Sequence, residues 1–249
     1  MKLLLTILTL LAGCATADPA NPMLGPTART PAKDIARNSQ STKLTGKILD
    51  VNPARLIDAS GEVDGKRFYD IPKKILDMTQ TKTGESKQDI YIFLNGPGGN
   101  VFPSVMIVNA IRLAQYRGFK VKCFTSMLAA SATFNMLATC SERYALPQAQ
   151  LLFHPVRIML GGNPFSGPEV LTAQDTIRLS AELDKIDADE IQFLCDNMVS
   201  NQKECNEVKG YYYAEYMWTA AELATFAVPG FLTIVDDITG IPNLFNMGN

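Results

Sequence analysis

Two side chains of this sequence, Ser131 and His154, could together perform nucleophilic catalysis. Ser131 stands among small residues in the segment 129–132, Ala-Ala-Ser-Ala, which leaves its hydroxyl sterically open. A serine attacks a carbonyl only when a neighbouring base of near-neutral pKa accepts its proton, and His154 is the only histidine in the chain. Each residue also has a structural alternative, Ser131 as a helix N-cap and His154 as a buried structural side chain.

A glycine-rich segment at 95–100, Asn-Gly-Pro-Gly-Gly-Asn, could stabilise the negative charge that such an attack creates. Glycine permits backbone conformations that other residues resist, and a helix that follows begins with free N–H groups. The alternative is a tight strand-to-helix turn without a catalytic role. The segment lacks the Gly-Lys-Ser/Thr ending of a nucleotide-binding loop.

The elements that must position these residues alternate between strand and helix. Short apolar runs predict strands at 48–51, 56–59, 90–94, 121–124 and 151–153. Helical patterns cover 69–78, 101–117 and 132–140. The stretch 168–199 predicts one or two longer helices, which could pack on a partner subunit. This alternation predicts an α/β domain with crossover connections and a mostly parallel sheet. The three candidate segments follow strands, where ligands collect in open α/β sheets.

The N-terminus predicts export and lipid anchoring. Residues 1–13 have the charge and the short apolar run of a signal peptide, which is too short to span a bilayer. Leu-Ala-Gly-Cys at 11–14 resembles a lipobox, in which Cys14 carries acyl chains; the alternative is a plain secretory signal. We expect a tether over 14–44, a catalytic domain over 45–249, and a location in a bacterial cell envelope, on the outer membrane of a two-membrane host.

Charge and cysteine content narrow the function classes. The chain has 23 Lys+Arg and 25 Asp+Glu without a long run of one sign, so nucleic acid is not an expected partner. No Cys-x-x-Cys pattern is present, and we expect neither a metal nor a cofactor. Beyond Cys14, export favours two disulfides, Cys195 with Cys205 and Cys123 with Cys140; the alternative leaves Cys123 and Cys140 as buried thiols.

In order and spacing, these blocks resemble the proteolytic subunit of the Clp protease family. The resemblance spans about 55–237 and is most specific at Leu-Phe-His-Pro, 152–155. Further matching segments are Leu-Ile-Asp-Ala-Ser-Gly-Glu-Val at 56–63, Asp89 to Gly99, and Arg-Tyr-Ala-Leu-Pro at 143–147. The resemblance implies a Clp/crotonase-like fold of repeated ββα crossover units with outer helices.

The resemblance also implies roles for individual residues. Ser131 would be the nucleophile, His154 the general base and Glu215 the third triad member, standing where the family has Asp. Glu215 as a solvated residue is the alternative. The backbone N–H groups of Gly98 and Ala132 would form the oxyanion hole. Substrate backbone would contact Gly99 and the handle-strand glycines Gly161 and Gly162, although Pro164 removes a donor there.

The activity expected from this resemblance is hydrolysis of peptides or unfolded chains by a serine peptidase. Assembly into a homo-oligomeric ring is an implied possibility, whereas a Clp-type ATPase partner is not expected, because an exported protein has no ATP supply. Rival functions are a catalytically inactive scaffold or peptide-binding lipoprotein of the same fold, a crotonase-type acyl-CoA enzyme, and Ser–Lys chemistry using Lys120 or Lys122. The Ser/His pair argues against the last two.

Overall fold

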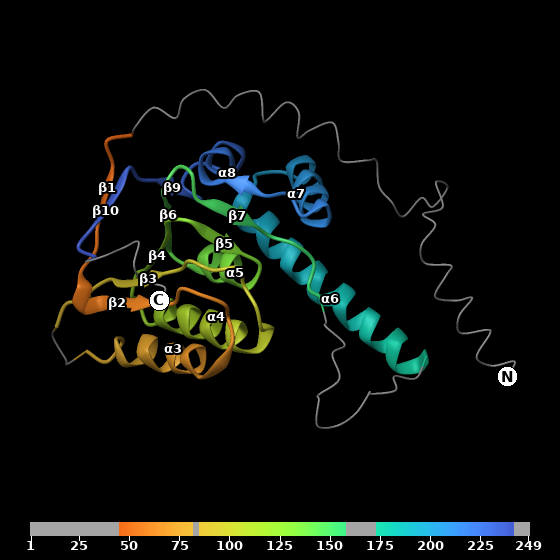
Figure 1. Cartoon of the computed structure of the whole chain (residues 1–249), viewed down its shortest axis with the longest axis horizontal. Coiled ribbons are helices and arrows are strands. Elements are labelled where there is room, and N and C mark those ends of the chain that lie inside the picture. Colours follow the sequence, from red (N-terminus) through yellow and green to blue (C-terminus); the bar gives the residue numbers. More distant parts are fainter. Residues whose placement is uncertain (1–44, 82–84, 158–172, 242–249) are drawn as a thin grey trace, which may run out of the picture.

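A five-stranded parallel sheet is the centre of the fold in the computed structural model, which describes residues 45–81, 85–157 and 173–241 (Figure 1). Its strand order is β2-β3-β4-β6-β9, and every neighbouring pair is parallel. The bounds are β2 Leu56–Asp58, β3 Ile90–Phe93, β4 Val121–Thr125, β6 Glu142–Ala145 and β9 Thr233–Ile234. All four residues of β3 are buried, which explains its continuous apolar run.

Helices α3 (Gly65–Asp77) and α4 (Val101–Tyr116) pack against each other on one side of this sheet (Figure 1). The buried sides of both helices contribute isoleucines to the main core, including Ile71 and Ile107, which are fully buried. The short helix α5 (Ala132–Thr139) packs on α4. A short 3-10 turn, Pro53–Arg55, leads directly into β2.

A second, smaller sheet lies beyond the carboxyl ends of the central strands. It contains β5 (Leu128–Ala130), β7 (Gln150–Leu152) and β8 (Trp218–Thr219) in that order. The chain after β3 joins it through a parallel bridge between Gly96 and Ala129, and the chain after β2 pairs Val63 with Gly99. Successive central strands therefore each continue into a second extended segment, which confirms repeated ββα units with a mostly parallel sheet.

The C-terminal part of the described chain is largely helical. It comprises α6 (Ala173–Met198), α7 (Gln202–Ala214) and α8 (Ala220–Phe226), and then β10 (Asp237–Thr239), which pairs in parallel with β1 (Ile48–Asp50). The first half of α6 projects away from the rest of the domain (Figure 1). In the described ranges no helix is long and apolar enough to cross a membrane.

The sequence-based elements agree with this structure to within a few residues, with some omissions. The five expected strands correspond to β1, β2, β3, β4 and β7, and the expected helices to α3, α4, α5 and α6. The sequence patterns did not predict the strands β5, β6, β8, β9 and β10 or the helices α7 and α8. The missed strands are two to four residues long, too short for an alternating pattern to emerge. The helix α7 carries three consecutive tyrosines that obscure its periodicity.

Both expected cysteine pairs are disulfide-bonded in the structure. Cys123 lies on β4 and Cys140 follows α5, so this bridge fixes the end of the helix that begins after Ser131. Cys195 on α6 joins Cys205 on α7 across the turn between the two helices.

Candidate active site

Ser131 occupies an unusual backbone position between β5 and α5. Its φ of 54° and ψ of −127° lie outside the regions that residues other than glycine ordinarily adopt. Its amide donates to the carbonyl oxygen of Leu152 at 2.8 Å, which fixes the turn to the neighbouring strand. Ser131 is the N-cap residue of α5, but its hydroxyl makes no capping hydrogen bond to the helix and is not used as a structural cap. Backbone strain of this kind, of order 1–3 kcal/mol, is typical of functional sites.

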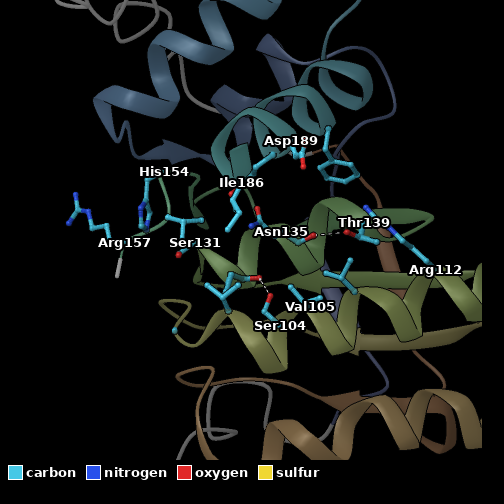
Figure 2. Close-up of a pocket in the computed structure, with 17 residues that line it drawn as sticks. Ser104, Val105, Arg112, Ser131, Asn135, Thr139, His154, Arg157, Ile186 and Asp189 are labelled. Atoms are coloured by element: carbon cyan, nitrogen blue, oxygen red, sulfur yellow. Dashed lines mark hydrogen bonds between the residues drawn. The ribbon is translucent and has the colours of Figure 1, made fainter. Parts of the chain in front are cut away.

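His154 reaches the same place from the adjacent strand. Strands β5 and β7 pair in parallel with Ala130 opposite Leu152, so the residues that leave both strands emerge together. Ser131 follows β5 directly, and His154 comes two residues after β7. Both side chains line one end of the same cavity (Figure 2). The structure therefore brings together the two residues that the sequence singled out for nucleophilic catalysis.

The tautomer of His154 follows from its hydrogen bond. Its Nδ1 lies 2.8 Å from the carbonyl oxygen of Pro155. A carbonyl oxygen can only accept, so the proton of the neutral ring resides on Nδ1 and the lone pair of Nε2 is free. An unprotonated Nε2 is the form that a general base requires.

Gly98 lies against the nucleophile. Its φ is +96°, and a Cβ atom placed there would come within 2.6 Å of the Cβ of Ser131 and 3.0 Å of the amide nitrogen of Ala132. Ala132 is the first residue of α5, so its N–H has no acceptor within the helix. The glycine-rich segment thus lies beside the start of α5, next to Ser131, as an oxyanion hole requires.

Asn95 holds this loop in place, a role that the sequence analysis did not identify. Its Oδ1 accepts hydrogen bonds from the Oγ1 of Thr125 and the amides of Ser126, Met127 and Leu128, at 2.9–3.2 Å. Gly96 adds backbone hydrogen bonds to β5 on the same side. One amide side chain therefore ties the glycine-rich segment to the chain that leads into Ser131. The only feature of the sequence that could have indicated this role is the position of Asn95 just after a buried strand.

A cavity of about 400 Å³ opens beside Ser131 between α4, α5 and α6. Figure 2 shows Ser131 and His154 at one end, Asn135 midway and Arg112 at the opposite end. Its wall combines apolar side chains with a few polar ones. The lining residues besides Ser131 and His154 are Gly99, Val101, Ser104, Val105, Val108, Arg112, Ala132, Asn135, Thr139, Val156, Arg157, Ile186, Asp189, Glu190 and Phe193.

Asp187 is a buried acid that supports the histidine loop and that sequence reasoning missed. Its side chain is on α6, with 7% of the residue exposed. Oδ1 accepts hydrogen bonds from the amide of Val156 and from the hydroxyl of Tyr212, each at 2.9 Å. Val156 is two residues after His154, so Asp187 connects α6 to the segment that carries the imidazole. The only sequence signal for this role was that Asp187 is an acidic residue on the buried face of the predicted helix.

Glu215 follows α7 in a left-handed conformation, with φ of 52°. Its carboxylate forms an ion pair with the guanidinium of Arg157, three residues after His154. Within the described part of the chain, no hydrogen bond joins Glu215 to His154, whose Nδ1 bonds to Pro155 instead. The structure thus brings Glu215 to the His154 segment and pairs it with the arginine of that segment.

The remaining candidates are placed as follows. Gly99 lines the cavity and lies against Val63, where a Cβ would meet the carbonyl oxygen at 2.7 Å. Cys14, Gly161 and Gly162 lie outside the described residues. Lys122 pairs with Asp89 at 2.6 Å and Lys120 with Glu142 at 3.0 Å, so both ammonium groups are engaged in ion pairs.

A comparison with known protein families identifies this arrangement. The family model for Clp protease matches residues 37–203, which is more than half of the chain. The chain belongs to the Clp protease family. Its membership supports a serine peptidase, and the mixed α/β architecture with a mostly parallel sheet is consistent with the fold of this family.

Individual relatives of this Clp protease family member are moderately similar to it. Subunit 2 of the ATP-dependent Clp protease proteolytic component of Pseudomonas aeruginosa is 29% identical, over 54% of this chain and 64% of its own length. Subunit 1 from Mycobacterium bovis is 27% identical, over 63% of this chain and 82% of its own. The ATP-dependent Clp protease proteolytic subunit of Streptococcus mutans is 24% identical, over 63% of this chain and 76% of its own length. The chain thus spans just under two thirds of the Pseudomonas relative.

Proposed function

We propose that this protein is a serine peptidase that cleaves peptides or unfolded chains through an acyl-enzyme on Ser131. The observation that supports the proposal most strongly is the convergence of Ser131 and His154 at one end of a cavity, with Gly98 against Ser131. The hydroxyl of Ser131 makes no capping hydrogen bond to its helix, and the imidazole holds its proton on the nitrogen that the mechanism leaves protonated.

The reaction would proceed in two balanced steps. The Oγ of Ser131 attacks the peptide carbonyl carbon, its proton passes to Nε2 of His154, and the oxyanion is met by the N–H groups of Gly98 and Ala132. The C–N bond then breaks, and the leaving amine takes the proton from the imidazolium. A water molecule, deprotonated by the same histidine, attacks the ester and releases the carboxylic acid with Ser131 restored.

Glu215 is proposed as the acid that orients His154 during turnover. Its ion pair with Arg157 holds Glu215 beside the segment that carries His154. Both side chains are substantially exposed, Glu215 at 39% and Arg157 at 64%. An exposed ion pair of this kind is worth only about 0–1 kcal/mol, so exchanging partners costs little. On leaving Arg157, the carboxylate would be free to replace the Pro155 carbonyl oxygen as the acceptor of the Nδ1 proton of His154.

The protein is further proposed to act in the cell envelope, held by a lipid on Cys14. The apolar run of 1–13 and the Leu-Ala-Gly-Cys segment support this location. Two disulfides are consistent with an oxidising compartment. Without ATP there, hydrolysis would be independent of an unfoldase. Self-assembly is proposed because α6 carries exposed isoleucines, Ile177 at 71% and Ile186 at 43% exposure.

Hydrolysis of an unfolded, fluorophore-labelled protein and of short labelled peptides, without ATP, tests the proposed function. A form of the protein that starts at residue 15, without the signal peptide and Cys14, should release fluorescence from both, and Ser131→Ala should abolish it. Activity that survives in Ser131→Ala, or a folded wild-type protein that cleaves neither substrate, contradicts the proposal. Metabolic labelling with a tagged fatty acid tests the anchor, because Cys14→Ser should lose the label.

A further inference from the structure

The cavity beside Ser131 has apolar walls near the nucleophile. Val101 and Val105 come from α4, and Ile186 comes from α6. Ser131, Ala132 and Gly99 line the same cavity, so a group attached to the carbon that Ser131 attacks has direct access to it. The natural occupant is therefore the side chain of the substrate residue whose carbonyl is cleaved, if Ser131 acts as proposed above.

Asn135 places an unsatisfied acceptor in this cavity. Its Oδ1 is buried and has no hydrogen-bond partner among the described residues. Asn135 is three residues after Ala132 on α5, which puts it about 4.5 Å further along the helix axis. Figure 2 shows it midway between Ser131 and the far end. A buried acceptor without a partner is costly, and a ligand that brings an N–H donor would satisfy it.

Glu190 adds a carboxyl group to the same wall. Its side chain interacts with Asn135, and its Oε2 lies 3.1 Å from the hydroxyl of Tyr212, which also donates to Asp187 at 2.9 Å. Tyr212 has a single hydroxyl proton for two acidic groups. Burial raises the pKa of Glu190, hydrogen bonds from Asn135 and Tyr212 lower it, and the charge of Asp187 raises it. A cation bound here would relieve the repulsion between the two acids.

The positive charges that line the cavity lie away from this point. Arg112 is eleven residues beyond Val101 on α4, about 16 Å along the helix axis, and its guanidinium lies 5.6 Å from the ring centre of Phe193. Arg157 is occupied by its ion pair with Glu215. Asp189 is exposed and adds a further negative charge at the rim.

We propose that the cavity selects a lysine or arginine at the residue whose carbonyl is cleaved, with Asn135 and Glu190 as the residues that determine this specificity. The apolar walls accommodate the methylene stem, and the two acceptors bind its terminal N–H donors. The inference rests on the proposed function, since it takes Ser131 as the nucleophile. It adds to that function the chemical class of substrate, a basic side chain.

The test uses two peptidyl diphenyl phosphonates, one with lysine and one with norleucine at the residue bonded to phosphorus. Norleucine has the same stem as lysine without the ammonium group. Attack by Ser131 forms an O–P bond and releases phenol, so intact mass reports the rate of modification. We expect the lysine probe to react at least about tenfold faster with wild type, the scale of a hydrogen bond to a charged group.

Glu190→Gln retains an acceptor for Tyr212 and should reduce this preference to about threefold or less, as should Asn135→Leu. Asp184→Asn is the matched control, because it removes an exposed charge from the same helix outside the cavity lining and should leave the preference unchanged. Equal or faster reaction of the norleucine probe overturns the specificity and leaves the peptidase proposal standing. A preference that survives Glu190→Gln and Asn135→Leu overturns their assignment. If folded protein reacts with neither probe, both proposals fail.

Discussion

The α-carbon of Gly98 faces Ser131 so closely that a Cβ atom there would lie 2.6 Å from the serine Cβ. This contact joins the glycine-rich segment to the nucleophile and leaves no room for a side chain at position 98. The positive φ of Gly98 imposes the same restriction through the backbone.

Gly98→Ala should therefore disable the site. The added methyl group must displace Ser131 or the carbonyl of Ala130, which lies 2.8 Å away, and so misalign the oxyanion donors. We expect kcat to fall by about 10²–10³, the loss typical of removing one such donor. Gly61→Ala is the matched control, because its φ of +102° imposes similar strain where nothing lies within 4 Å of the added atom. Equal losses in both variants would show that strain, not contact, is responsible.

Glu215 and Arg157 should have opposite effects on turnover. If Glu215 orients His154 in the active form, Glu215→Gln lowers kcat by several orders of magnitude, as loss of the acid does in other triads. Arg157→Gln removes the competing partner and should leave kcat equal or higher, with little loss of stability because the ion pair is exposed. Steady-state kinetics on both variants show whether Glu215 orients His154 or serves only as the ion-pair partner of Arg157. Full activity in Glu215→Gln would leave the Pro155 carbonyl as the sole orienting group.

Glu190 should make stability depend on pH. Burial is the largest effect and raises its pKa above the ordinary 4.5, so folding favours the protonated form. The stability contributed by this proton is fully present below pH 4.5, the ordinary pKa, and is lost as the pH rises through the higher pKa of Glu190 in the folded protein. Urea unfolding from pH 4 to 8 should show wild type losing stability relative to Glu190→Gln over that window. A difference between the two proteins that stays constant with pH would contradict the shift.

The bridge between Cys123 and Cys140 should stabilise the fold behind the nucleophile. The two cysteines are 17 residues apart, and a loop of that size contributes about 3 kcal/mol in the chain-entropy account. Replacing both with alanine should lower the free energy of unfolding by roughly 2–4 kcal/mol in denaturant titrations. The double variant Cys195→Ala/Cys205→Ala provides the comparison, since that bridge joins α6 to α7. We expect only the first variant to reduce the rate of Ser131 modification.

Local signals in the sequence were sufficient for much of this architecture. Strand β3 is apolar because both faces are buried, and the start of α4 follows a glycine-rich turn capped by Asn100. Ser131 and His154 were identifiable from the sequence alone, because Ser131 has small neighbours and His154 is the only histidine. Both disulfides join cysteines that are close in the sequence, 17 and 10 residues apart, which is why the sequence predicted their pairing.

Long-range contacts explain what the sequence could not show. Asn95 acts on residues about thirty positions away, and Asp187 on a backbone amide 31 positions earlier, so neither has a local pattern. The pairing of Glu215 with Arg157 spans 58 positions and likewise depends on the folded chain. Strand β5 is three residues long and mostly alanine, so its extended form comes from pairing with β7.

Labelling of the mature protein with a fluorophosphonate probe, with mass mapping of the modified residue, tests the central claim most directly. Wild type should be labelled on Ser131, while Ser131→Ala should not react and His154→Ala should react far more slowly. Circular dichroism of each variant verifies that it is folded. Folded wild-type protein that remains unlabelled, or that is labelled at a residue other than Ser131, would contradict the assignment of Ser131 and His154 as nucleophile and base.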